Sequence, residues 1–117
     1  MNNKQFEQCF KQKVEDCKAL LFKKAKEYAT DEDRLIAFKT AAWLENTSPE
    51  QALGGMLAKH IVSIFEMIKE PDNYSNEKWD EKINDTINYM ILLYALRHDA
   101  QDHKVCNADE VETDEKY

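Results

Sequence analysis

The sequence predicts an all-α protein, a compact four-helix bundle-like domain followed by a disordered acidic C-terminal tail. Apolar residues recur at three- and four-residue steps over long stretches, as they do on one face of a helix. The 117 residues include only two glycines and two prolines, which leaves little turn chemistry for a sheet protein. The length suits one domain. We assign residues 1–98 to that domain and residues 99–117 to the tail.

The first two helices are predicted over residues 3–28 and 31–45. Thr30 can cap the second helix with its hydroxyl group. The acidic residues that follow it suit the positive first turn of a helix. In the first helix the apolar positions share one face, which we expect to be buried. These positions are Phe6, Cys9, Phe10, Val14, Cys17, Leu20, Leu21 and Ala25.

A third helix is predicted over residues 49–69. Ser48 can cap it, a proline suits its first position, and Gln51 can complete a capping box. Gly54 and Gly55 fall in its second turn, where each costs about 1 kcal/mol relative to alanine. Either a close helix crossing or the approach of a ligand to the backbone would account for them.

The fourth helix, residues 77–97, is the one around which we expect the others to pack. A loop over residues 70–75 precedes it. Its second half is apolar around nearly the whole circumference, which is typical of a helix buried on all sides. Its first half keeps Glu81, Asp85 and Asn88 on one side. This polar stripe identifies a candidate site.

The net charge of −7 is concentrated in the tail, where seven acids stand against two lysines. Such a composition is typical of disordered segments, and the alternative is a decoy for a basic surface on a partner. Direct binding to nucleic acid is not expected, because it requires a basic face. No segment is apolar enough to cross a membrane, and the N-terminus does not resemble a secretion signal. We expect a cytoplasmic protein without membrane contact, located in the host cytoplasm if phage-encoded.

Two carboxylates of the fourth helix are candidate ligands for magnesium. Glu81 and Asp85 lie one helical turn apart and project from the same side. Magnesium uses one or two carboxylates and completes its shell with water and phosphate oxygens. The alternative is a solvated acidic pair, which Lys78 and Lys82 neutralise.

A polar flank of the third helix carries Lys59, Ser63 and Glu66, with His60 at its border. If this flank faces the acidic stripe, Glu66 adds a metal ligand and Lys59 meets a phosphate. The alternative is a salt bridge between Lys59 and Asp85, with His60 as a core histidine.

Basic residues also surround the first turn between helices. Together with two aromatic residues they have the chemistry to hold the phosphates of a nucleotide and to stack its base. The set comprises Lys24, Lys26, Arg34, Lys39, Tyr28 and Phe38. The alternative is exposed helical charge around core aromatics. The sequence contains no glycine-rich phosphate loop, no cysteine–histidine zinc spacing and no nucleophile elbow.

Over residues 17–96 the chain resembles a group of small bacteriophage and prophage proteins. The resemblance rests on the segments FKKAKEYATDEDRLIAFKTAA, AKHIVSIFEMI and WDEKINDTINYMILLYAL. The pattern resembles the nucleotide modification associated domain family. More distantly, it is similar to the MazG-like nucleotide pyrophosphohydrolases, all-α enzymes in which helical acids hold magnesium against a nucleoside triphosphate.

The resemblance implies a set of site residues. Those that match the first family are Lys24, Lys26, Tyr28, Asp85, Asn88 and Tyr89. A MazG-like site would take Glu81 or Asp85 as a metal ligand. Where such enzymes have acids on the third helix, this chain has Lys59, Ser63 and Glu66. Binding without turnover is therefore as consistent with these residues as catalysis.

We therefore expect a phage-type protein that binds a nucleotide or a nucleotide-derived molecule between the third and fourth helices. As a magnesium-dependent, pyrophosphohydrolase-like enzyme it would hold the metal with Glu66, Glu81 and Asp85. The alternative is a non-catalytic phage interaction protein that counters a host defence or a host enzyme, by sequestering a nucleotide signal or by binding a host protein. A further alternative is a homo-oligomeric helical module, whose apolar strip would include Phe22, Trp43 or Trp79.

Overall fold

The computed structural model describes residues 1–28 and 32–107, without the side chains of Tyr28 and of residues 102–107. All of its regular elements in these ranges are helical: α1 (Asn3–Tyr28), α2 (Ile36–Glu45), α3 (Pro49–Lys69), the short 3₁₀ helix η1 (Pro71–Asn73) and α4 (Asn76–Asn107). The prediction of an all-α protein with four helices is confirmed. No helix in the described ranges is long and apolar enough to span a membrane.

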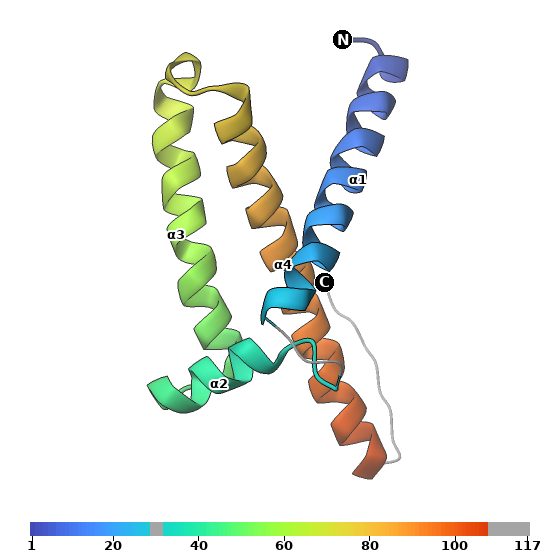
Figure 1. Ribbon diagram of the computed structural model, residues 1–117, viewed down its shortest axis with the longest axis vertical. Coiled ribbons are helices and arrows are strands. Elements are labelled where there is room, and N and C mark those ends of the chain that lie inside the picture. The colour runs from blue at the N-terminus through green and yellow to red at the C-terminus, as the bar shows by residue number, and fades with distance from the viewer. Residues whose placement is uncertain (29–31, 108–117) are drawn as a thin grey trace, which may run out of the picture.

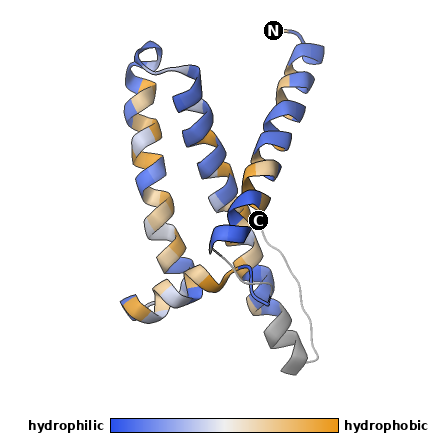
Figure 2. Cartoon of the chain, in the orientation of Figure 1, coloured by the Kyte–Doolittle hydropathy of each residue, from blue (hydrophilic) through white to orange (hydrophobic). Residues whose placement is uncertain are grey.

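The helices form an antiparallel hairpin with two additions. α3 and α4 run in opposite directions and are joined by η1 (Figure 1). α2 lies across the base of this hairpin. α1 crosses α4 near its own C-terminal end and diverges from it toward the N-terminus (Figure 1). The start of α4 is hydrophilic, whereas α2 and α3 carry much of the apolar sequence (Figure 2).

The boundary between α2 and α3 follows its local chemistry. The Gln51 amide donates to Ser48 Oγ at 3.1 Å, and the Ser48 amide donates to Gln51 Oε1 at 3.3 Å, which confirms the predicted capping box. α2 ends at Asn46, whose φ of 57° places it in the left-handed region that asparagine tolerates. This cap turns the chain directly into α3.

Two helix boundaries differ from the prediction. α2 begins at Ile36 and not at residue 31, because Asp33 Oδ1 accepts from the Leu35 amide at 2.9 Å and holds a turn there. The predicted cap, Thr30, lies outside the described residues. α4 continues past residue 97 to Asn107. Asp99, which we had assigned to the tail, accepts a 2.7 Å hydrogen bond from Lys39 and so ties this extension to α2. The remaining predicted tail, residues 108–117, lies outside the described residues.

The core lies at the base of the molecule. It consists of five buried apolar residues: Leu35, Phe38, Leu53, Leu57 and Leu96. Part of α4 packs against this cluster through Tyr89, Leu92 and Leu93. The start of α2, the start of α3 and the middle of α4 are therefore held together by one group of side chains.

Two predictions of burial were wrong in part. The apolar stripe of α1 is buried at Cys17 and half-buried beyond it, but Phe6, Cys9, Phe10 and Val14 are exposed. The reason is the divergence of α1 from α4 (Figure 1). α4 is likewise not covered on all sides, because Met90, Ile91 and Tyr94 are exposed.

Candidate functional site

A pocket of about 310 Å³ opens where α1, α2 and α4 meet beside the core. Its lining is mostly apolar and includes few polar groups, as is typical of small-molecule sites. The lining residues are Leu21, Lys24, Arg34, Ala37, Phe38, Met56, Asp85, Asn88, Tyr89 and Leu92. This pocket does not lie between α3 and α4, where we predicted the site, since α3 contributes only Met56 to its lining. The ring centroids of His60 on α3 and Tyr89 on α4 lie 5.1 Å apart.

Asp85 stands between one residue of α1 and one of α3. Its Oδ1 lies 3.4 Å from Lys24 Nζ, and its Oδ2 lies 4.0 Å from His60 Nδ1, too far for a hydrogen bond. The Asp85 side chain is largely buried, whereas that of Lys24 is 44% exposed. The predicted alternative, a salt bridge between Lys59 and Asp85, is not formed, because Lys59 is exposed and Lys24 takes its place.

Asn88 is a buried polar residue of the pocket, 6% exposed. Its Nδ2 donates to the Cys17 carbonyl at 3.2 Å, and because a carbonyl only accepts, this contact fixes the amide orientation. Its Oδ1 is left buried without a hydrogen-bond partner, as is His60 Nδ1. An unpaired buried acceptor costs about 1–3 kcal/mol.

Arg34 and Lys39, two further basic residues of the first turn, have different roles. Arg34 lines the pocket, and its Nη2 donates to the Leu21 carbonyl at 3.1 Å, which holds the segment before α2 against α1. Lys39 does not line the pocket. Its Nζ donates to Asp33 Oδ2 at 2.8 Å and to Asp99 Oδ2 at 2.7 Å, and these hydrogen bonds raise the pKa of Lys39. Lys39 therefore joins structural elements and is not placed to meet a phosphate at this pocket.

The structure does not bring the other predicted residues to this pocket. Lys26 and Lys59 are exposed and do not line it, and the side chain of Tyr28 lies outside the described residues. Glu66 pairs with Lys69 at 3.2 Å, and Glu81 pairs with Lys78 at 3.7 Å.

The three acids predicted to bind metal are not assembled. Within residues 1–27 and 32–101, no three histidine, cysteine or acidic side chains lie close enough to hold a metal ion. Asp85 alone of the predicted ligands lines the pocket.

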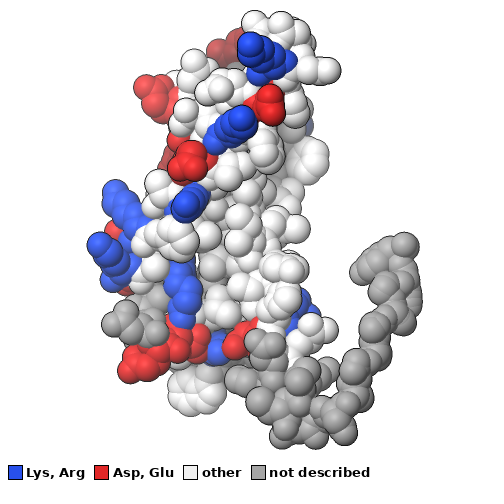
Figure 3. All heavy atoms as spheres, turned by 90° about the vertical axis from the view of Figure 1, so that its right-hand side faces the viewer, with Lys and Arg blue, Asp and Glu red and all other residues white. Residues whose placement is uncertain are grey.

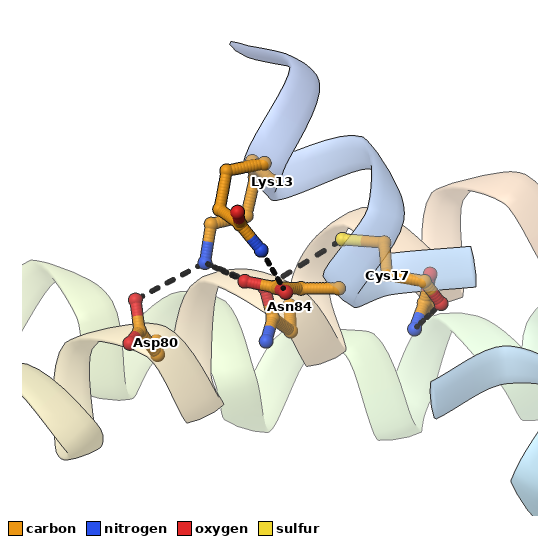
Figure 4. A network of polar contacts seen from close by, with 7 residues as sticks. Lys13, Cys17, Asp80 and Asn84 are labelled. Carbon is orange, nitrogen blue, oxygen red and sulfur yellow. Dashed lines mark hydrogen bonds and ion pairs between the residues drawn. The ribbon is translucent and has the colours of Figure 1, made fainter. Parts of the chain in front are cut away.

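A second polar network fixes α1 on α4 above the pocket (Figure 4). Lys13 Nζ donates to Asn84 Oδ1 at 2.8 Å and to Asp80 Oδ1 at 3.1 Å. Cys17 Sγ donates to the same Asn84 oxygen at 3.6 Å. Burial raises the pKa of the Cys17 thiol. The network sets the register of the two helices, and this register brings Lys24 to Asp85.

A wholly apolar hollow of about 390 Å³ lies between α1 and α4. Phe10, Val14, Ile87 and Ile91 are among its lining residues. From the side of α1, uncharged surface lies beside the charged side chains (Figure 3). Lys13, Cys17 and Lys18 also line this hollow but present only apolar surface to it, and no carboxylate is among its described lining residues.

Sequence reasoning missed two members of this site. His60 was assigned to the core, although its contact with Tyr89 and its approach to Asp85 place it behind the pocket. The Cys17 carbonyl, which orients Asn88, has no side-chain signal in the sequence. The spacing of Cys17, Leu21 and Lys24 along one face of α1 was the available signal.

No protein-family model, curated protein or solved structure matches this chain. The resemblance to the nucleotide modification associated domain and MazG-like families therefore stays a prediction.

Proposed function

We propose that the pocket binds a nucleotide, with its phosphates toward Lys24 and Arg34 and its base beside Tyr89. One observation carries the proposal. The sequence predicts residues of a nucleotide site in two segments that are far apart along the chain, residues 24–39 and 85–89. Both segments contribute side chains to this one pocket. The predicted site residues that line the pocket are Lys24, Arg34, Asp85, Asn88 and Tyr89.

The two cations are available to an anionic ligand. Lys24 is partly exposed, and its 3.4 Å pair with Asp85 is long for a charged hydrogen bond, which has N–O distances of about 2.7–2.9 Å. Arg34 donates one hydrogen bond to Leu21, and a guanidinium has five donors in a planar fork. Phosphate oxygens at the mouth of the pocket would accept from both side chains.

The interior suits an aromatic base. Phe38 and Tyr89 meet edge to face, with ring centroids 6.4 Å apart, and present an apolar wall. A cavity of about 310 Å³ is at the small end for ligand sites, so it suits a nucleoside whose phosphates remain at the mouth.

Magnesium would be held largely by the ligand. Among the described lining residues Asp85 is the only one with a carboxylate, and one carboxylate suffices when phosphate oxygens and water complete the shell. The ion would neutralise phosphate charge. Because Glu66 and Glu81 are paired elsewhere, we propose binding without hydrolysis, as suits a phage-type protein that sequesters a nucleotide signal.

A thermal-shift and calorimetry panel of nucleoside mono-, di- and triphosphates, with and without magnesium, tests the proposal. At least one ligand is expected to raise Tm by several degrees at saturation, because binding to the folded state alone stabilises it. Lys24→Ala should weaken binding about tenfold or more. Lys26→Ala is the matched control, because Lys26 is exposed and does not line the pocket.

Three outcomes would count against this assignment. Equal losses in both lysine variants would show that the pocket is not the site. Release of phosphate or pyrophosphate by the wild type would overturn binding without hydrolysis. A panel with no shift at all would instead favour the non-catalytic interaction protein, and a host protein partner would then be sought.

A further inference from the structure

The face of α3 that its own chain leaves bare carries a helix-packing seam. Five small or apolar residues follow one another at steps of four, three, four and three, the spacing of a and d positions in coiled coils. They are Gly54, Ala58, Ile61, Phe65 and Ile68. All five are exposed, Phe65 at 62%. A neighbouring face of α3 supplies Leu53, Leu57 and Met67 to the interior, so this helix has two adjacent apolar faces and the described residues cover only one of them.

No described residue of the chain packs against the glycines of α3. A Cβ atom added at Gly54 or Gly55 would meet no atom within 4 Å, and neither residue has a positive φ. The close crossing that we predicted for them is therefore absent from the described chain. Small residues four positions apart, such as Gly54 and Ala58, allow another helix to approach closely. Such a neighbour would offset the low helix propensity of Gly54.

The order of side-chain volumes along the seam indicates which helix that is. The small residues lie at the start of α3 and the bulky ones at its end. In an antiparallel pair of identical helices centred on Ile61, Gly54 lies opposite the partner's Ile68, and Ala58 lies opposite the partner's Phe65. Small then meets large at every level except the centre, where the two copies of Ile61 meet, as close packing requires. A parallel pair would crowd two phenylalanines together and leave a void at the glycines.

We propose that two copies of this chain associate through α3, antiparallel, about a two-fold axis near Ile61. The interface is isologous, so it closes at a dimer. Trp43, 80% exposed, and Leu44 lie at the end of α2, which meets α3 at its first turn (Figure 1), and would extend the contact toward the partner's Ile68. With Val62 and the bulky seam residues, the exposed apolar surface is on the order of 600 Å² per copy. A stable interface buries about 800 Å² per partner.

The test is the molar mass of the full chain, measured by light scattering and sedimentation over a wide concentration range. The wild type is expected at twice 13.7 kDa. Phe65→Asp should raise the dimer Kd by about thirtyfold or more, since it places a charge in the centre of the seam. Phe22→Asp is the matched control, because Phe22 is also 62% exposed but lies on α1. Far-UV circular dichroism checks that both variants stay helical.

A monomer at every concentration would overturn the proposal and leave the seam to another protein or to residues outside the described ranges. A dimer that survives Phe65→Asp would place the interface elsewhere. The antiparallel arrangement has its own test, with the native cysteines replaced by serine. Ile61→Cys should form an intermolecular disulfide, whereas Phe65→Cys should not. Cross-linking at both positions would indicate a parallel pair. These measurements do not depend on nucleotide binding, so either proposal can fail without the other.

Discussion

The two ends of the molecule differ in how much of their apolar surface they cover. At the base, Leu53 has no exposed surface, and side chains from α2, α3 and α4 close around it. At the other end, the first half of α1 diverges from α4 and leaves Phe10 60% exposed. Both regions have apolar residues at helical spacing. The difference shows that periodicity selects the face of a helix, whereas burial depends on whether another element reaches it.

The same contrast bears on stability. Isolated helices shorter than about 12–15 residues are marginal in water, and the first half of α1 has few tertiary contacts to support it. We therefore assign the cooperative unit to the base and expect local opening at the free end of α1.

The largest effect should come from truncating the centre of the base. Leu53→Ala should lower the free energy of unfolding by about 2–5 kcal/mol, because it removes buried methyl groups and leaves a cavity. Phe10→Ala removes a larger side chain but should cost less than about 1 kcal/mol, since that side chain is mostly solvated. Urea unfolding followed by circular dichroism measures both. Similar losses in the two variants would mean that a partner covers α1 in solution.

Alkylation of cysteines should distinguish the exposed first half of α1 from the part of α1 that packs on α4. Cys9 is exposed, whereas Cys17 is buried and its thiol has a raised pKa caused mainly by that burial. Because the thiolate is the reactive form, iodoacetamide at neutral pH should modify Cys9 about tenfold or more faster than Cys17. Peptide mass spectrometry resolves the two sites. Equal rates would show that α1 separates from α4 much more readily than the Lys13 network implies.

A smaller loss of stability is expected when the hydrogen bonds of Lys39 to Asp33 and Asp99 are removed. Lys39→Met removes the ammonium that Asp33 and Asp99 share and should cost about 1 kcal/mol near neutral pH. The pKa of Lys39 is raised in the folded state above its ordinary value of 10.5. Its contribution is therefore complete below 10.5 and is lost as the pH rises through the folded-state pKa.

The wild type and Lys39→Met should accordingly converge in stability only in strongly alkaline solution. Unfolding curves of both proteins at neutral and alkaline pH test this point. A difference that does not depend on pH would assign the effect to packing of the lysine stem rather than to its charge.

Local signals in the sequence were enough for the helices. The capping box at Ser48 is a short-range interaction and was predicted correctly, as were the limits of α3. The start of α2 was missed, because Asp33 satisfies the Leu35 amide and delays the helix. Propensity alone does not show which of several acids will do so.

The sequence predicted which segments contribute to the candidate site, but not which of their side chains pair with one another. Lys24 and Asp85 were both selected, yet their pairing depends on the crossing of α1 over α4, which the Lys13 network sets across the fold. Glu81 and Asp85 were placed together because they are one turn apart. That spacing does not reveal that Glu81 turns to Lys78 while Asp85 faces inward.

The two tryptophans give the chain separate fluorescent reporters. Trp79 is half-buried at the tip of the hairpin, where its indole Nε1 donates to the Pro71 carbonyl at 3.1 Å and its ring meets Tyr74. Trp43 is almost fully in water at the end of α2. In the monomer, iodide should quench the fluorescence of Trp43 selectively. Association through α3 would shield that residue and leave the emission of Trp79 unchanged, so unlabelled protein can report its own assembly.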